Sequence, residues 1–201
     1  AAMREEKWDR GRGNTNGMRY LAGKRMLVVG LGGSGSVVAR LAAALGMSVH
    51  GTRNSSREGP AFVDYVGLSH EVNSLAAEAD VIVNALPLTD TTAGLLDAEF
   101  FDAAKDGTIF VNVGRGKTVV TDALVDALDS GKVSGAGLDV TDPEPLPPGH
   151  ALWAFENVII TPHVAGRGGE WERHAALLAE NLRRYVDGGK LLNVVDPAKG
   201  Y

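Results

Sequence analysis

The sequence Gly30-Leu31-Gly32-Gly33-Ser34-Gly35 has a glycine spacing that lets a backbone loop hold a pyrophosphate. Gly30 permits a tight turn, Gly32 lets the phosphates approach the backbone, and Gly35 lets the following helix pack closely on the preceding strand. The N-terminus of that helix then faces the negative charge. Plain strand-to-helix turns can have the same spacing, but a nonpolar run precedes this loop and a helix-forming stretch follows it. That context favours a dinucleotide site.

Basic and hydroxyl side chains occupy the place where an NAD site usually has an acidic residue, about 20 residues after the glycines. The stretch from Val49 to Arg57 contains no acidic residue, and Arg53 stands near the expected position with Thr52 and Asn54 beside it. A guanidinium attracts the 2′-phosphate of NADP, whereas a carboxylate repels it. The sequence therefore predicts NADP(H) as the preferred cofactor, with NAD(H) possible. The alternative is that Arg53 and Arg57 are ordinary surface charges.

Three further polar segments follow expected strands. Asn112-Val113-Gly114-Arg115-Gly116 follows one, the stretch from Gly137 to Leu146 with Asp139 and Glu144 follows another, and Thr161-Pro162-His163-Val164-Ala165-Gly166 follows a third. Ligands bind at the carboxyl ends of strands in an open parallel sheet. We expect Arg115, Glu144 and His163 to converge there beside the nicotinamide ring. Each could instead be an ordinary surface or structural residue, and no metal site is expected.

Alternating strand and helix patterns supply the elements that position these residues. The pattern predicts an α/β fold, a Rossmann-type doubly wound parallel sheet with helices on both faces. Expected strands are 26–29, 47–50, 80–85, 108–113, 135–140 and 158–161. Expected helices are 3–10, 36–45, 72–79, 97–105, 121–130 and 169–186, with Gly46 ending the second and Thr121 capping the fifth.

The ordered series of motifs resembles the D-isomer-specific 2-hydroxyacid dehydrogenases, which include phosphoglycerate dehydrogenase and glyoxylate/hydroxypyruvate reductase. The resemblance extends from about Trp8 to Tyr201 and includes the stretch from Leu86 to Leu95. It implies an oxidoreductase that transfers hydride between a nicotinamide cofactor and a 2-keto acid or D-2-hydroxy acid. The alternative is a catalytically inactive cofactor-binding or corepressor-like module with the same fold.

By position, the resemblance implies that Arg115, Glu144 and His163 are the catalytic set. Arg115 would hold the substrate carboxylate and carbonyl oxygen, His163 would exchange a proton with that oxygen, and Glu144 would keep His163 a competent acid. Asp139 would meet the nicotinamide carboxamide. The complete set of expected cofactor contacts is Gly30, Gly32, Gly33, Ser34, Gly35, Thr52, Arg53, Asn54, Arg57, Leu86, Pro87, Thr92, Val113, Gly114, Arg115, Asp139, His163 and Gly166.

The chain departs from the family pattern in its loop and in its extent. Gly33 and Ser34 stand where the family often has Arg-Ile, so a side-chain contact to the pyrophosphate is lost. Family members have roughly a hundred more residues before this point, so we expect the chain to be the cofactor half without most of the substrate domain, either as a fragment or as a shortened natural protein. We expect an N-terminal helix and dimer arm over 1–22, the dinucleotide-binding domain over 23–187, and a tail over 188–201 that returns toward the absent domain. The resemblance of the stretch from Trp8 to Tyr20 to a dimer arm predicts a homodimer.

The composition of the chain gives no reason to expect nucleic acid or a membrane as a partner. The chain has 201 residues and a formal net charge of −5, which gives no electrostatic reason to expect nucleic acid as a partner. No nonpolar run is long enough for a membrane span, so no membrane partner is expected either. There are no cysteines, which excludes disulfides and fits a cytoplasmic location. The expected partners are therefore a small 2-keto acid and a second copy of the chain.

Overall fold

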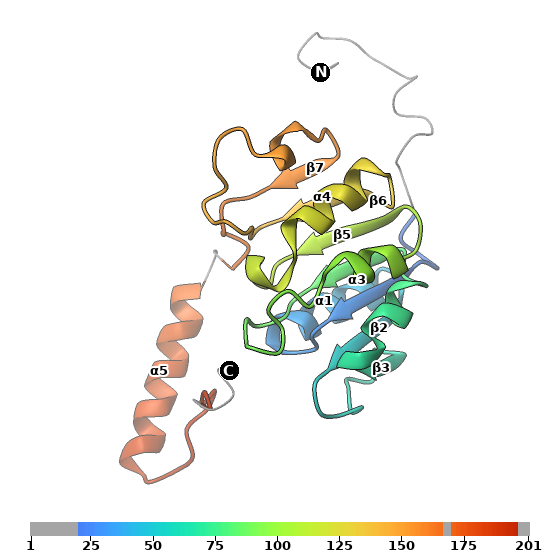
Figure 1. Ribbon diagram of the computed structural model, residues 1–201. Coiled ribbons are helices and arrows are strands. Elements are labelled where there is room, and N and C mark those ends of the chain that lie inside the picture. The colour runs from blue at the N-terminus through green and yellow to red at the C-terminus, as the bar shows by residue number, and fades with distance from the viewer. Residues whose placement is uncertain (1–19, 167–169, 197–201) are drawn as a thin grey trace, which may run out of the picture.

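Seven strands form one parallel sheet in the computed structural model, which describes residues 20–166 and 170–196. They are β1 (Arg25–Val29), β2 (Ser48–Arg53), β3 (Tyr65–Leu68), β4 (Val81–Asn84), β5 (Thr108–Asn112), β6 (Val133–Leu138) and β7 (Val158–Ile160). Their order is β3-β2-β1-β4-β5-β6-β7, with β3 at one edge of the sheet and β7 at the other (Figure 1). The order reverses between β1 and β4, and ligands bind at such a reversal. The predicted Rossmann-type sheet is confirmed.

Helices cover both faces of this sheet. The α-helices are α1 (Gly33–Ala44), α2 (Val72–Ala76), α3 (Ala98–Ala103), α4 (Thr121–Asp129) and α5 (Glu170–Val186), and short 3-10 turns span Ser69–Glu71, Gly116–Thr118 and Ala151–Ala154. Val28 of β1 packs in one buried cluster with residues of α1, whereas its neighbours Leu27 and Val29 pack in the other with residues of α2, α3 and α4. The strand is therefore buried on both faces, as its unbroken nonpolar run predicts.

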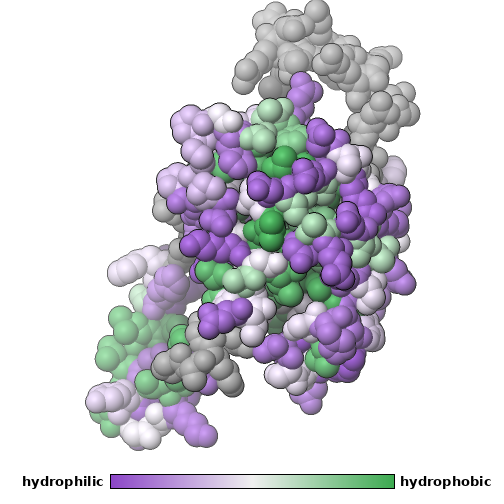
Figure 2. All heavy atoms as spheres, viewed as in Figure 1, coloured by the Kyte–Doolittle hydropathy of each residue, from purple (hydrophilic) through white to green (hydrophobic). Residues whose placement is uncertain are grey.

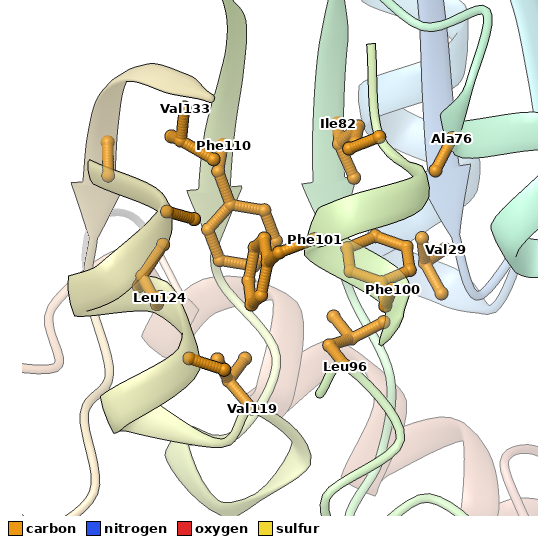
Figure 3. Close-up of a cluster of buried hydrophobic side chains, with 14 of the residues drawn as sticks. Val29, Ala76, Ile82, Leu96, Phe100, Phe101, Phe110, Val119, Leu124 and Val133 are labelled. Carbon is orange, nitrogen blue, oxygen red and sulfur yellow. The ribbon is translucent and has the colours of Figure 1, made fainter. Parts of the chain in front are cut away.

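The larger cluster centres on three phenylalanines between the sheet and the helices α3 and α4 (Figure 3). The rings of Phe100 and Phe101 lie 5.2 Å apart, and those of Phe101 and Phe110 lie 5.3 Å apart, both edge to face. Because β5 carries Phe110 and α3 carries the other two, the contacts fix α3 against the sheet.

Helix α5 stands apart from the sheet in Figure 1, and most of its side chains are exposed. Trp171 is 82% and Leu178 62% exposed, and Figure 2 shows hydrophobic side chains gathered on this helix. The segment after α5 returns along it, since Leu192 N donates to Asn181 Oδ1 at 2.8 Å and Asn181 Nδ2 donates to Leu192 O at 3.1 Å. No helix in the described ranges is both long and nonpolar enough to cross a membrane.

Several sequence expectations are wrong in detail. The sequence pattern misses β3 entirely and ends β2 at residue 50, whereas β2 continues to Arg53 because its last four residues pair with β3. Thr121 does not cap α4. Val120 holds the capping position, and the Thr121 hydroxyl instead donates to Asp142 O at 2.7 Å. The helix expected over 3–10 lies outside the described residues, whereas Gly46 ends α1 with a φ of +79°, as predicted.

The remaining boundaries shift by a few residues. Helix α1 begins at Gly33 rather than at residue 36, because the last glycines of the loop already form its first turn. Strand β6 runs two residues earlier than expected, from Val133 to Leu138. Its end places Asp139 immediately beyond the sheet edge, where the loop after β7 also lies.

Candidate functional site

A cleft of about 820 Å³ opens at the point where the strand order reverses. The glycine loop after β1 lines it together with the segments that follow β2, β4 and β5. Among the residues expected to touch the cofactor, those that line it are Gly30, Gly32, Gly33, Ser34, Thr52, Arg53, Asn54, Leu86, Pro87, Thr92, Val113, Gly114 and Arg115. The structure therefore brings most of the expected contacts to one place.

Local geometry explains the glycines of the loop. Gly30 has a φ of +99°, which a side chain would strain. A Cβ at Gly35 would overlap the carbonyl oxygen of Gly30, so Gly35 lets α1 start against β1, although it does not itself line the cleft. Nothing lies within 4 Å of a Cβ built at Gly32 or Gly33, which leaves their backbone open to a ligand.

Strand β2 braces this loop from the side. Gly30 N donates to Thr52 Oγ1 at 3.1 Å, and Leu31 N donates to Thr52 O at 2.9 Å. Thr52 is 3% exposed, so these bonds are shielded from water. On the other side, Thr92 Oγ1 donates to Pro87 O at 2.6 Å and closes the loop after β4. The walls of the cleft are therefore held by hydrogen bonds within the protein.

The two arginines after the glycine loop have different surroundings. Arg53 ends β2 and lines the cleft, and its buried Nε has no hydrogen-bond partner in the described part of the chain. Arg57 does not line the cleft. Its Nη2 lies 2.7 Å from Glu71 Oε2, and its Nη1 donates to the Tyr65 hydroxyl at 2.8 Å. Arg53 is thus available to an anion in the cleft, whereas Arg57 is already neutralised.

A buried polar network fixes the segment that carries Arg115. Asn84 Nδ2 donates to Asn112 Oδ1 at 3.0 Å and to Thr118 Oγ1 at 2.7 Å, and Thr118 Oγ1 donates to Arg115 O at 2.6 Å. Asn84, Asn112 and Thr118 are at most 2% exposed. Because buried amides need partners, this network holds the turn after β5 in one conformation. The Arg115 side chain is exposed, and its Nη1 donates to Gly114 O at 2.7 Å.

Glu144 and His163 form a pair, as the sequence predicts. His163 Nδ1 lies 2.7 Å from Glu144 Oε1, and the two side chains are 50% and 41% exposed respectively. His163 has a φ of +53°, an unfavourable conformation for a residue other than glycine. The backbone is held there by His163 N, which donates to Asp139 O at 2.9 Å and to Thr161 O at 3.0 Å. The pair leaves the Nε2 of His163 unused by Glu144.

Asp139 fastens the loop that carries His163. Its Oδ1 accepts from Thr161 Oγ1 at 2.6 Å and from Val164 N at 2.9 Å, and its Oδ2 accepts from Ala165 N at 2.9 Å. Burial would raise the pKa of Asp139, but these hydrogen bonds and the nearby His163 hold that pKa below its usual value. Oδ2 keeps a lone pair for a further donor, so a contact to a nicotinamide carboxamide stays a prediction.

Asp139, His163 and Gly166 do not line the cleft itself; they lie along the same sheet edge, beyond β6 and β7. The expected contacts leave out other lining residues, among them Ser36 and Ser69, whereas Thr89 belongs to the stretch from Leu86 to Leu95 that the resemblance includes. Ser69 follows β3, so recognising the short nonpolar run at Tyr65-Val66 as a strand would have placed it at this edge. Ser55 and Ser56 also line the cleft after Asn54.

Comparison with known proteins agrees with this geometry. A family model described as D-isomer specific 2-hydroxyacid dehydrogenase, NAD binding domain, matches residues 1–165. The glyoxylate reductase of Aeropyrum pernix is 38% identical over 179 residues, which cover 88% of this chain and 52% of that protein. The chain spans about half the length of the curated relatives it matches.

Solved structures give the same result. A D-isomer specific 2-hydroxyacid dehydrogenase from Xanthobacter autotrophicus, in complex with NADPH and MES, aligns with a TM-score of 0.86 and 37% identity, over 100% of this chain and 80% of that one. An NADPH-dependent glyoxylate/hydroxypyruvate reductase from Sinorhizobium meliloti, in complex with NADP and sulfate, aligns with a TM-score of 0.86 and 29% identity, over 100% of this chain and 62% of that one. The chain belongs to the D-isomer specific 2-hydroxyacid dehydrogenase family and carries its NAD-binding domain.

Proposed function

We propose that this chain is the cofactor-binding part of an NADP(H)-dependent reductase that transfers hydride between the nicotinamide and a 2-keto acid or D-2-hydroxy acid. The observation that carries the proposal is the joint placement of two features. The glycine-loop cleft and the Glu144–His163 pair lie at the carboxyl edge of one sheet. A dinucleotide bound at this edge would present its reactive ring near a proton donor.

The cleft fits NADP(H). The open backbone at Gly32 and Gly33 suits a pyrophosphate, and Arg53, which lines the cleft and whose Nε has no partner among the described residues, suits a 2′-phosphate. The bound nicotinamide supplies the hydride, which is the chemistry that the protein itself lacks. The two NADP-bound structures named above support this choice, and NAD(H) remains a possible second cofactor of the same cleft.

Two side chains, His163 and Arg115, would act on the substrate, and Glu144 would act through His163. Glu144 holds Nδ1 of His163, so Nε2 is left to donate a proton to the carbonyl oxygen of a 2-keto acid, or to accept one in the reverse direction. Arg115 would bind the substrate carboxylate with its exposed guanidinium. The Asp139 carboxylate accepts from Val164 N and Ala165 N, and Asp139 O accepts from His163 N. These bonds hold the backbone of His163 in place and leave Nε2 of its imidazole to exchange the proton.

The test is a hydride-transfer assay on the gene product that contains this chain, with glyoxylate, hydroxypyruvate and pyruvate. His163→Ala should lower kcat by about 10²- to 10⁴-fold, a larger effect than any on the Kd for NADPH, because the imidazole transfers the proton and His163 does not line the cleft. His174→Ala, at an exposed position on α5, is the matched control and should behave like the wild type. Binding of NADPH without reduction of any of these 2-keto acids would instead favour a binding module.

We further propose that the chain forms a homodimer. Nearly all of the segment expected to be the dimer arm lies outside the described residues. Support comes from Val37 and Leu41 on one face of α1 and from Leu45 directly after the helix, which are 48%, 54% and 58% exposed. Nonpolar patches of this kind commonly mark protein interfaces. Light scattering at micromolar concentration should give twice the mass of the chain, and a monomer would refute the proposal.

A cytoplasmic location is the last part of the proposed function. It is supported by the absence of cysteine from the sequence, which fits a compartment that keeps thiols reduced. Cell fractionation with an antibody to the protein tests it, and recovery in a membrane or extracytoplasmic fraction would count against it.

A further inference from the structure

The ion pair between Arg57 and Glu71 lies directly behind the subsite that contains Arg53. Glu71 Oε2 accepts from Leu68 N at 2.7 Å, and Leu68 is the residue of β3 that pairs in register with Arg53 of β2. Ser69 and Val72, on either side of Glu71 in the sequence, line the cleft, and Ser69 Oγ donates to Asn54 Oδ1 at 3.4 Å. Glu71 is therefore a close neighbour of the place where a 2′-phosphate would lie.

The Glu71 carboxylate is held by several donors. Besides Leu68 N, its Oε1 accepts from the Tyr65 hydroxyl at 2.7 Å, and Arg57 supplies the opposite charge. These contacts hold the carboxylate ionised in any neutral buffer. Of the groups in contact with Glu71, Arg57 is the cation, since Leu68 N and the Tyr65 hydroxyl are neutral donors. Without Arg57, a full negative charge would stand beside the cleft.

We propose that Arg57 is a positioning residue that sets cofactor preference indirectly, by neutralising a carboxylate, Glu71, that would otherwise repel the 2′-phosphate received by Arg53. This inference rests on the NADP(H) preference in the proposed function. It differs from the sequence expectation that Arg57 contacts the phosphate itself. A guanidinium that already binds Glu71, the Tyr65 hydroxyl and Val66 O has few donors left for a ligand.

The test is a double-variant cycle on this chain, with the Kd for NADPH and for NADH measured by fluorescence titration. Arg57→Gln should weaken NADPH binding by about three- to tenfold at low salt, because an uncompensated carboxylate beside the cleft repels a phosphate across partly screened solvent. NADH lacks the 2′-phosphate, so its Kd should change by less than about twofold in the same variant. Higher ionic strength should shrink the effect on NADPH.

Restoration by a second substitution separates this mechanism from direct contact. Arg57→Gln combined with Glu71→Gln removes both charges, and NADPH binding should return to within about twofold of the wild type. A double variant as weak for NADPH as Arg57→Gln alone would overturn the inference and make Arg57 a direct ligand. Equal losses for NADPH and NADH in Arg57→Gln would also overturn it, since a collapsed loop affects both cofactors.

The NADP(H) assignment itself has a separate readout. Arg53→Gln should remove the preference for NADPH over NADH while Arg57 and Glu71 stay intact. Wild-type protein that binds NADH as tightly as NADPH would refute the NADP(H) preference in the proposed function. A preference that depends on Arg53 but is not restored in the Arg57→Gln/Glu71→Gln variant would refute only the role of Arg57.

Discussion

Replacement of Asp139 by asparagine tests how the His163 loop is held. The carboxylate accepts three hydrogen bonds from that loop, from Thr161, Val164 and Ala165. An asparagine of the same shape can keep Oδ1 and its two bonds, but it puts an NH₂ group opposite the Ala165 N–H. One hydrogen bond to a charged acceptor is lost, and two donors face each other.

The expected loss in the free energy of unfolding is about 1.5–3 kcal/mol, the value of one hydrogen bond to a charged group. For a domain of this size, the loss corresponds to a fall in Tm of about 3–12 °C. Function should suffer as well, because the loop positions His163. In the gene product that contains this chain, kcat should fall, and loss of the predicted contact from Oδ2 to the nicotinamide carboxamide should also weaken NADPH binding.

Urea unfolding and thermal melting of the chain measure the stability loss. Asp106→Asn is the control, because the Asp106 side chain is 89% exposed and its ion partner among the described residues is Lys132; its unfolding curve should match that of the wild type. If Asp139→Asn melts like the wild type, the three hydrogen bonds do not hold the loop and the reasoning fails. A loss of stability seen only at low pH would also contradict the reasoning. Because the pKa of Asp139 is depressed in the folded protein, its carboxylate stabilises the fold at pH values above the usual titration range of aspartate.

Three further variants test other parts of the site. Thr118→Val removes the hydroxyl that joins Asn84 to Arg115, so urea unfolding should show a loss of about 1–3 kcal/mol, whereas the exposed Thr91→Val should show almost none. Gly35→Ala should lower stability by about 1–3 kcal/mol through overlap with Gly30 O, whereas Gly33→Ala, with open space around it, should keep stability and weaken NADPH binding; equal melts would contradict this. The backbone bond from Leu68, with Tyr65 and Arg57, lowers the pKa of Glu71 from 4.5 to about 2, so its stabilisation is complete above pH 4.5 and disappears as the pH falls toward 2. In Glu71→Gln, the free energy of unfolding should therefore depend less on pH between 2 and 4.5. An unchanged pH dependence in this variant would argue against the network.

Short-range patterns determined much of this protein. The nonpolar run of β1 next to the glycines of the loop is local information, and it was enough to predict the fold class and the pyrophosphate-binding turn. The order of the motifs placed Arg115, Glu144 and His163 after successive strands. The contact between Glu144 and His163 followed, because parallel strands bring their carboxyl ends to one edge.

The tertiary structure alone decided the rest, since long-range pairing carries no local signal. Strand β3 has only four residues, one of which is a glycine, so its sequence favours a strand weakly. It forms a strand by pairing with β2, and that pairing extends β2 to Arg53. The same pairing brings Glu71 to Arg57 and separates two arginines that look equivalent in the sequence. The Asp139 carboxylate likewise accepts hydrogen bonds from residues 22 to 26 positions later in the sequence. Which charges are free and which are already neutralised depends on distances in space, and the sequence does not contain them.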